Sequence, residues 1–283
     1  MYYKLTVENQ NNQSLVLTNN RNYVIRSIDG LTPPIATINS SVVAMVDGAI
    51  YNSARVETRN IIINISPLIP VEKNRNMLYT YFPIKKQVRL YYENGTKHVY
   101  IDGYVDSIDG SLFDISQTLS ISITCLEPYW KSQSLSTADV SDTESLFEFP
   151  FAIDKEGTEF SRINKTSTVN VINYGDVEIG MIIEMIADNI VDNPRIYRTD
   201  TGEMFALWFR MEDKDKIIIN TNRNKKSVTL IREGQYSNLI SSLIPGSVWF
   251  NLNLGDNIFA YESDSGADRL EVRFNFYNSY AGV

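Results

Sequence analysis

Alternating apolar and polar residues dominate the first half of the chain and predict β-strands. Residues 55–65 alternate with a period of two, and residues 112–124 do the same over a longer run. Two shorter runs, residues 3–7 and 15–17, flank a turn rich in Asn and Gln. A period of two places successive side chains on opposite faces of a sheet. We therefore predict a sheet that opens with a hairpin.

A single helix and a tight hairpin are also predicted in this half. Residues 71–82 carry apolar side chains at helical spacing, and Pro83 stops the run because proline lacks an N–H group. Residues 87–92 and 97–105 are alternating runs joined by a short connection with Asn-Gly at its centre. Asn-Gly is the preferred pair for a type I′ turn, so these two runs are predicted to form a hairpin.

The segment over residues 30–58 is unusually long for a connection and is predicted to be an extended arm. Pro33 and Pro34 open it and favour extended backbone, and Gly48 marks a turn within it. Connections between elements are usually about 4–6 residues long. Since so long a segment needs something to hold it, we expect the arm to lie against a neighbouring subunit.

The second half of the chain consists of short alternating runs separated by turn signals, a pattern typical of an antiparallel β-sandwich. Residues 131–145 are rich in Ser, Thr and Asp, which favours a linker. We therefore predict a mainly β protein with a first domain over residues 1–130, a linker over 131–145 and a sandwich over 146–283. The predicted strands of the sandwich are residues 169–172, 178–187, 204–211, 216–220, 227–232, 249–254, 258–262 and 269–277.

Composition and charge argue against several functional classes. The 283 residues carry a formal net charge of -8 and no block of Lys or Arg, so no nucleic-acid contact is expected. The longest apolar runs are about five residues, far below the roughly 20 that span a bilayer, and the start lacks the layout of a signal peptide. We expect synthesis in a cytoplasm and no membrane insertion. One cysteine and one histidine allow neither an internal disulfide framework nor a Cys/His zinc site.

No residue stands out as catalytic, cofactor-binding or metal-binding. His98 lies beside a turn and is expected to face solvent rather than act as a base. Cys125 alternates with apolar residues and is expected to be a small buried side chain. Residues 264–268 lack the ligand spacing of a calcium loop and are interpreted as a hairpin turn. Carboxylates that could serve a glycosidase are interpreted as a solvated acidic surface, namely Glu144, Glu148, Asp154, Glu156 and Glu159.

Several segments, by their order and spacing, carry a resemblance to a known family. These segments are residues 30–34 and 47–49 of the arm, residues 55–65, 78–82, 91–104 and 121–130, and residues 252–257 near the end. Together they resemble the distal tail (Dit) proteins of long-tailed phages with non-contractile tails, and the likeness spans essentially the whole chain. The expectations that follow from this resemblance concern assembly rather than catalysis.

The resemblance implies a structural role at the tip of a phage tail, in the baseplate region. The first domain would form a homo-hexameric ring, with the arm embracing the adjacent subunit by strand pairing and a galectin-like sandwich projecting outward. The ring would join the tail tube protein to the tail-tip hub, a tail fibre or a receptor-binding protein of a virion, prophage particle or tail-like bacteriocin. No enzymatic activity and no cofactor are implied. The candidate interface residues are Leu31, Pro33, Pro34, Val43, Met45, Tyr91, Asn94 and Tyr100.

Two other functions stay open on the sequence. A carbohydrate-binding protein would recognise host cell-wall glycans through aromatic side chains of the sandwich. Trp208 and Trp249 are the candidates, although a buried core position is the default expectation for both. A glycoside hydrolase would need an acid–base pair, and the chain offers none that differs from its acidic background. Saturable glycan binding would support the first alternative, and turnover of wall polymer the second.

Overall fold

The computed structural model describes residues 3–45, 47–114, 116–139, 141–145, 161–165 and 168–283, with the backbone alone for residues 141–145 and 161–165. The fold is mainly β with antiparallel sheets, and the predicted fold class is confirmed. The chain forms two compact units. Unit 1 comprises Met1–Gln133 together with Ser279–Val283, and unit 2 comprises Ser134–Asn278.

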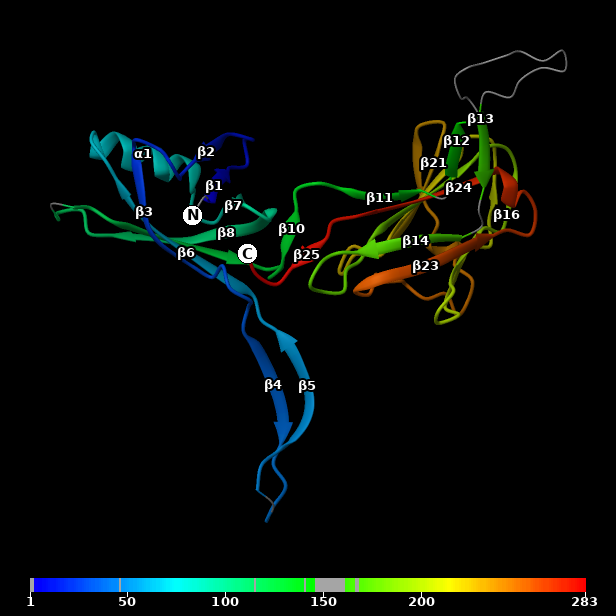
Figure 1. Ribbon diagram of the computed structural model, residues 1–283, viewed down its shortest axis with the longest axis horizontal. Helices are drawn as coiled ribbons and strands as arrows, with labels where there is room; N and C mark the ends of the chain where they lie inside the picture. Colours follow the sequence, from blue (N-terminus) through cyan, green and yellow to red (C-terminus); the bar gives the residue numbers. More distant parts are fainter. Residues whose placement is uncertain (1–2, 46, 115, 140, 146–160, 166–167) are drawn as a thin grey trace. The chain divides into compact units, whose positions relative to one another are not determined.

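Unit 1 is built on one large antiparallel sheet (Figure 1). The main path runs in the order β2-β1-β7-β8-β9-β6-β3, and β10 lies beside β8 and pairs with β25 from the end of the chain. Strands β6 and β9 alternate between buried and partly exposed residues, as their sequence period predicts. The strands are β1 (Tyr3–Glu8), β2 (Ser14–Val16), β3 (Tyr23–Asp29), β6 (Arg59–Pro67), β7 (Gln87–Asn94), β8 (His98–Gly110), β9 (Leu119–Cys125), β10 (Trp130–Ser132) and β25 (Ser279–Tyr280).

Helix α1 (Val71–Tyr81) packs against β6 and covers part of the core of unit 1. It begins after Pro70, and the N–H group of Phe82 closes its last turn by donating to the Leu78 carbonyl at 2.8 Å. Leu78 is fully buried, and the buried Asn74 side chain donates to the Leu68 carbonyl at 2.8 Å. The predicted helix is confirmed. In the part of the chain that the structure describes, no helix is long and apolar enough to cross a membrane.

The predicted strand over residues 112–124 is wrong in its first half. Strand β9 begins only at Leu119, which lies opposite Gly110 of β8. The preceding residues belong to the connection, where Leu112 and Phe113 are exposed. Alternation alone does not make a strand, because the backbone of a strand also needs a neighbouring strand to receive its hydrogen bonds.

Unit 2 is a β-sandwich of a six-stranded and a four-stranded sheet. The first sheet has the order β11-β24-β15-β20-β21-β22 and the second has the order β14-β23-β17-β18, with β12–β13 and β16–β19 as separate pairs. The elements are β11 (Ser136–Asp139), β12 (Ser141–Ser145), β13 (Ser161–Lys165), β14 (Thr168–Asn173), β15 (Ile182–Ala187), β16 (Val191–Asp192), β17 (Arg195–Arg198), β18 (Met204–Ala206), β19 (Arg210–Met211), β20 (Lys216–Asn220), β21 (Ser227–Arg232), β22 (Gln235–Asn238), η1 (Ile240–Ser242), β23 (Gly255–Glu262), η2 (Ala267–Arg269) and β24 (Leu270–Phe276).

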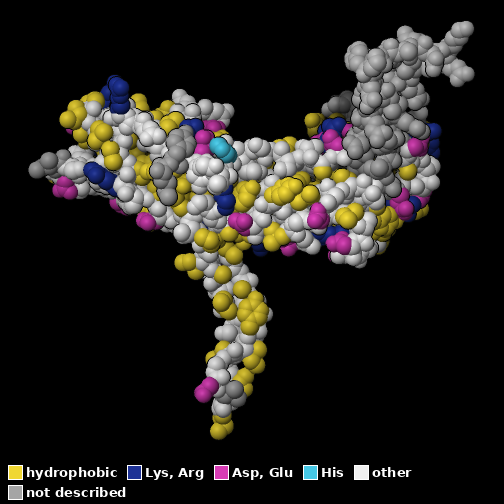
Figure 2. Space-filling view, viewed as in Figure 1, with side chains coloured by type: hydrophobic (Ala, Val, Ile, Leu, Met, Phe, Trp, Pro, Cys, Tyr) yellow, Lys and Arg dark blue, Asp and Glu magenta, His cyan; other side chains and the backbone are white. Residues whose placement is uncertain are grey.

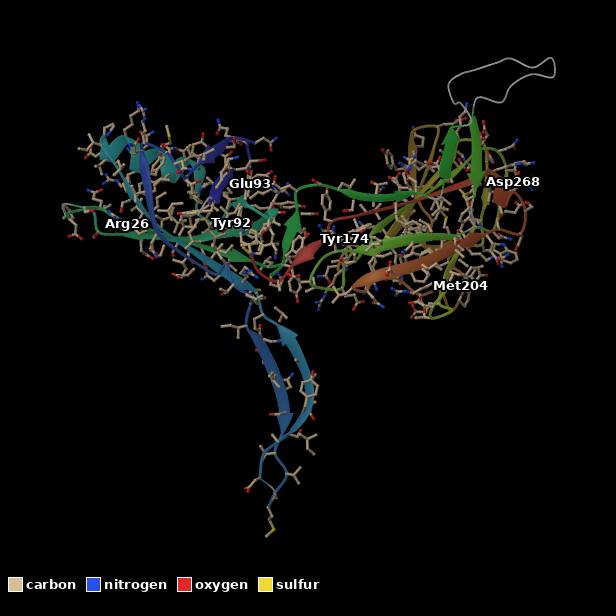
Figure 3. All side chains as sticks on the ribbon, viewed as in Figure 1. Arg26, Tyr92, Glu93, Tyr174, Met204 and Asp268 are labelled. Carbon is tan, nitrogen blue, oxygen red and sulfur yellow. The ribbon has the colours of Figure 1, made fainter. Side chains whose placement is uncertain are left out.

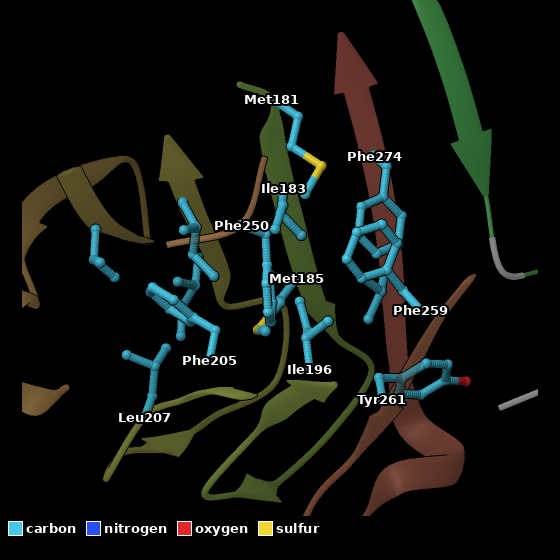
Figure 4. Close-up of a cluster of buried hydrophobic side chains, with 14 of the residues drawn as sticks. Met181, Ile183, Met185, Ile196, Phe205, Leu207, Phe250, Phe259, Tyr261 and Phe274 are labelled. Carbon is cyan, nitrogen blue, oxygen red and sulfur yellow. The ribbon is translucent and has the colours of Figure 1, made fainter. Parts of the chain in front are cut away.

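Aromatic and aliphatic side chains from both sheets of unit 2 fill one core (Figure 4). Phe259 of β23 and Phe274 of β24 belong to different sheets, and their rings stack with centroids 5.0 Å apart. Met181 and Met185 are fully buried beside them in the same cluster. Stacked aromatic pairs contribute roughly 0.5–1.5 kcal/mol beyond their burial, so this core ties the two sheets into one body.

Three connections of unit 2 differ from what the sequence pattern predicts. Strands β10, β11 and β12 run through the segment predicted as a linker, and the division between the units falls after Gln133. Residues 264–268 are not a hairpin turn, because they connect β23 to β24, which belong to different sheets. Residues 249–254 do not form a strand, and Leu252 makes only an isolated bridge to Ile179.

Candidate subunit interface

A two-stranded hairpin, here called the arm, stands where the sequence predicts a single extended segment. Strands β4 (Ala36–Ser41) and β5 (Ile50–Val56) form a sheet of their own, and Figure 1 shows them running away from the large sheet of unit 1. Every residue of both strands is exposed. The two strands satisfy each other's backbone groups along their inner edges, which explains how so long a connection keeps an ordered shape.

The two faces of the arm differ in chemistry. Residues directly opposite each other in a strand pair share a face, and Ile38 lies opposite Ala54 on an apolar face. The other face is polar, since the Asn39 side chain donates to the Ser53 hydroxyl at 3.1 Å and the Thr37 hydroxyl donates to the Glu57 carboxylate at 2.6 Å. The apolar face has no cover in the described structure, because Ile38 is 66% exposed.

Apolar side chains continue to the tip and toward the base of the arm. Val42, Val43 and Met45 lie in the connection between β4 and β5 and are exposed, and Ile35 before β4 is exposed as well. Figure 2 shows hydrophobic side chains along the length of the arm. Single exposed apolar residues are ordinary, but a continuous set on a thin hairpin is typical of an interaction surface.

The base of the arm is anchored by one buried cation, Arg59, the first residue of β6. Its Nη1 donates to the carbonyls of Gly30 at 2.5 Å and Thr32 at 2.8 Å, both at the start of the arm. Its Nε donates to the carbonyl of Pro128 at 2.6 Å, and its Nη2 donates to the carbonyl of Ala281. One guanidinium thus joins the arm, the connection after β9 and the end of the chain.

Burial sets the electrostatics of this anchor. Arg59 is only 3% exposed, and the loss of hydration lowers the pKa of its guanidinium from the ordinary value. Carbonyl oxygens carry partial negative charge, so the four acceptors replace part of the hydration that the cation has lost. The anchor is therefore satisfied only while the segments that supply these carbonyls keep their places.

The end of the chain holds the same place from the other side. The Val283 N–H group donates to the Leu31 carbonyl at 3.1 Å, and the Lys97 ammonium donates to the Gly282 carbonyl at 2.7 Å. A Cβ on Gly282 would crowd Pro33, so the backbone of residues 281–283 packs closely against the start of the arm. Of the predicted interface residues here, Leu31 is partly buried against the core of unit 1, Pro33 is exposed and Pro34 is half-buried.

The tyrosines predicted as interface residues of the β7–β8 hairpin lie together. The rings of Tyr91 and Tyr100 are 6.2 Å apart, and the Arg89 guanidinium lies 4.3 Å from the Tyr100 ring while it bonds both oxygens of Asp102. The Tyr91 hydroxyl donates to Glu8 at 2.9 Å, and burial together with this bond raises the pKa of Tyr91. Much of their bonding capacity is used within unit 1, and both rings remain partly exposed.

The third predicted residue of this hairpin, Asn94, forms hydrogen bonds within the turn between β7 and β8. Its Oδ1 accepts the N–H groups of Thr96 at 2.9 Å and Lys97 at 2.8 Å, which fixes the connection between the strands. His98 is exposed as expected, and Cys125 is fully buried, also as expected. Burial raises the pKa of the Cys125 thiol to about 12.

Solved structures share this fold over nearly the whole chain. The crystal structure of SPP1 Dit (gp 19.1), described as a paradigm of hub adsorption apparatus in Gram-positive infecting phages, is similar with a TM-score of 0.69 and 10% identity, covering 98% of this chain and 99% of that one. A chain of the phage P2 baseplate in its activated conformation with Ca is similar with a TM-score of 0.53 and 13% identity, covering 97% and 98%.

The sequence of unit 2 matches a known family. Residues 174–279 match the model of the siphovirus-type tail component, C-terminal domain. Unit 2 therefore carries a tail-component domain of the siphovirus Dit type. The resemblance stated from the sequence is confirmed, and the matched domain is a structural component of a phage tail. A search of curated protein sequences finds no match.

The two candidate tryptophans of unit 2 have different surroundings. Trp208 is 73% exposed, so the default expectation of a core position is wrong for it, and its backbone N–H group donates to the Ser242 carbonyl at 2.7 Å. Trp249 is half-buried, and its ring meets Phe205 edge-on at 5.2 Å, with the Lys226 ammonium 5.6 Å from the ring. Of the pair, Trp208 is the one that presents a ring to solvent.

None of the five carboxylates considered for a glycosidase has a described side chain. Glu148, Asp154, Glu156 and Glu159 lie outside the described residues, as does the side chain of Glu144. Within residues 264–268, the Asp264 carboxylate accepts hydrogen bonds from Asn193 at 2.8 Å and from Arg195. Those two partners engage both oxygens of Asp264.

The sequence pattern indicates the arm but not the role of Arg59 at its base. Arg59 alternates with apolar neighbours like any strand residue, and its four carbonyl partners come from positions as distant as Ala281. The one available signal is a charged residue on the buried face of a strand, since Ile61 and Ile63, on the same face, are buried. A charge at such a position predicts a buried polar network.

Proposed function

We propose that this chain is the distal tail ring subunit, which joins the tail tube to the tail-tip hub or receptor-binding apparatus. In this proposal unit 1 forms the homo-hexameric ring, unit 2 is a galectin-like outward domain, and the protein acts by assembly rather than catalysis. The observation that carries the proposal is the arm, an ordered hairpin whose apolar face is fully exposed. The baseplate named for one similar structure is itself an assembly, in keeping with a subunit role.

The chemistry of the arm favours a permanent protein contact. The arm carries two charged side chains, Asp47 and Arg55, and Arg55 is paired with Glu57 at 3.1 Å. Burial of the apolar face around Ile38 would therefore desolvate almost no charge. An arm that docks on a different surface of the next copy makes a head-to-tail contact. Contacts of this kind close into a ring when the rotation between copies allows it. A ring is therefore the assembly that this arm supports best.

The direct test is the mass of the purified protein by light scattering, with particle averaging by electron microscopy on the same sample. We expect a closed ring with a central opening and the mass of six chains. A monomer at every concentration, alone and with tail-tube protein added, would contradict the proposal. A closed ring with another number of copies would retain the hub role and replace the hexamer.

A second function, glycan binding by unit 2, is favoured by the exposure of Trp208. Exposed aromatic rings stack on sugars, and Trp208 is held in place because its backbone bonds Ser242 and Leu207 beside it is buried. In this interpretation Trp208→Ala removes saturable binding to wall glycans without a change in the melting temperature. Tyr174→Ala is the matched control, since Tyr174 is 71% exposed and lies in another connection of unit 2. A flat glycan array with the unmodified protein would rule this function out.

A further inference from the structure

Three positively charged side chains lie close together on one connection of unit 2. The connection between β20 and β21 reads Asn-Arg-Asn-Lys-Lys over residues 222–226 and is here called the basic connection. Its cations are Arg223, Lys225 and Lys226, and all three are exposed. The chain as a whole carries a net charge of -8, so this cluster departs from its general charge balance. A cluster of charge of one sign attracts ligands of the opposite sign.

The cations of the basic connection differ from the others of unit 2 in their partners. Every other Arg or Lys side chain that the structure describes in unit 2 has a carboxylate oxygen within 4.0 Å. Among the described residues, no carboxylate pairs with the three cations of the basic connection. Gly180 packs against the Asn222 backbone, and Glu178 near it instead accepts a hydrogen bond from the Asn251 side chain at 2.8 Å. The positive charge of the basic connection is therefore available to a ligand.

The backbone of the basic connection is held in one shape. Thr221, directly before it, is buried, and its N–H group donates to the Met181 carbonyl at 2.9 Å. The Oδ1 of Asn220 accepts the Asn222 N–H group at 3.0 Å, and the Lys225 N–H group donates to the Asn222 carbonyl at 3.0 Å. A ligand that pairs with the cations would therefore have to order their side chains but not their backbone.

A partly exposed aromatic ring lies beside the basic connection. The Lys226 ammonium is 5.6 Å from the centroid of the Trp249 ring, and Trp249 is half-buried. The ring is held in place because it meets Phe205 edge-on at 5.2 Å. The Val248 N–H group donates to the carbonyl of Met204, labelled in Figure 3, at 2.8 Å, which fixes the backbone next to Trp249. Positive charge and an aromatic surface thus adjoin one another.

We propose that the basic connection and Trp249 bind an anionic carbohydrate chain. The C–H groups of a sugar ring stack on an aromatic face, and the acidic groups of such a chain accept charge-assisted hydrogen bonds from Lys and Arg. One ligand then uses both features of this surface. The inference goes beyond the glycan binding proposed at Trp208, because it names another surface and requires a charged ligand.

Other anionic partners fit this surface less well. Residues 222–226 contain no apolar side chain, whereas a specific protein interface buries about 1,200–2,000 Å² around an apolar centre. Anionic membranes are recognised by clusters of about 4–8 Lys and Arg residues. Nucleic-acid binding relies on a basic stripe along a face or a helix, and the basic connection is a single short turn. An anionic carbohydrate chain needs only the few charges and the ring that are present.

The first test removes the three cations together. The probes are polygalacturonate, which carries carboxylates, phosphomannan, which carries phosphates, and neutral dextran. We expect at least one anionic probe to bind, dextran to bind far more weakly, and Arg223→Gln, Lys225→Gln and Lys226→Gln combined to weaken anionic binding roughly tenfold. The control combines three exposed cations that have carboxylate partners and so has the same net charge, namely Arg210→Gln, Lys214→Gln and Arg269→Gln.

Equal melting temperatures show that both triple variants are folded. If the test variant melts lower than the control, Lys225→Glu alone replaces it, with an expected loss of roughly threefold. If neither anionic probe binds, or the test variant binds as well as the control, the inference is overturned. Equal binding of poly-glutamate or oligothymidylate would show a general contact with polyanions and would overturn the carbohydrate.

The second test uses the aromatic ring and separates this inference from binding at Trp208. In a Trp208→Phe variant, the fluorescence of Trp249 is expected to change when the anionic probe binds, and Trp249→Phe is expected to remove that change. Trp208→Ala is expected to retain binding of the anionic probe. If Trp208→Ala abolishes that binding, the inference fails while the glycan binding proposed at Trp208 gains support. If Trp249 gives no change while the probe binds, the ring has no part in the site.

Discussion

An arm-deleted variant, in which a Gly-Ser link replaces residues 36–56, is expected to be a folded monomer under conditions where the unmodified protein assembles. The arm forms its own two-stranded sheet, and every residue of β4 and β5 is exposed, so its removal takes away no buried contact of unit 1. The apolar face around Ile38, by contrast, is the surface that assembly would bury. Loss of this face removes the hydrophobic contribution to association while the free energy of unfolding stays within about 1 kcal/mol.

Light scattering measures the change in mass, and thermal unfolding checks the fold of the variant. A finer version keeps the hairpin and changes one face only. Ile38→Ser on the apolar face is expected to weaken assembly, while Asn39→Ala on the polar face is its matched control at the neighbouring position of β4. The interpretation of the arm would fail if the arm-deleted variant formed the same particle as the unmodified chain.

Replacing Arg59 by Ala is expected to cause the largest loss of stability of any single substitution at the base of the arm. Four carbonyls from three segments would lose a charged donor, and Arg59 itself is only 3% exposed. Leaving a buried acceptor without its donor costs about 1–3 kcal/mol, so the loss of four such bonds is expected to cost at least about 3 kcal/mol. We expect the free energy of unfolding of unit 1 to fall by that amount and the midpoint temperature of its unfolding to fall by roughly 10–20 °C.

Tryptophan fluorescence can isolate the transition of unit 1. Trp130 is fully buried there, and Trp208→Phe with Trp249→Phe removes the other two tryptophans. Arg26→Ala is the control, because this exposed arginine donates to a single hydroxyl and its loss is expected to cost less than about 1 kcal/mol. Arg59→Lys is expected to lie between the two, since an ammonium cannot reproduce the planar fork of donors. A midpoint equal to that of Arg26→Ala would show that the carbonyl network contributes little.

Residues 281–283 help to hold the base of the arm. The Ala281 carbonyl and the Val283 N–H group come from the segment that follows unit 2 directly, and both hold residues at the base of the arm. The Val283 N–H group donates to the Leu31 carbonyl at 3.1 Å, so the hydrogen bonds at the base of the arm need residues 281–283 in place. The position of the base of the arm therefore depends on residues that are far apart in the sequence.

Local patterns in the sequence determined much of the fold. The period of two indicated the strands, the spacing over residues 71–82 indicated α1, and Asn-Gly indicated the β7–β8 hairpin. Each of these features depends on residues close together in the chain, where side-chain period and turn chemistry act directly. The sequence also located the arm, because two prolines and an unusually long connection are visible without any tertiary contact.

Tertiary structure alone decided how these elements become a candidate interface. Arg59 bonds a carbonyl 222 positions away, and no local pattern reveals the order of the strands in the large sheet. Burial of Leu31 and exposure of Trp208 likewise follow from which neighbours arrive, not from the residues themselves. The physical reason is that hydrogen bonding and burial are settled by long-range contacts, whereas periodicity records only which face of an element is apolar.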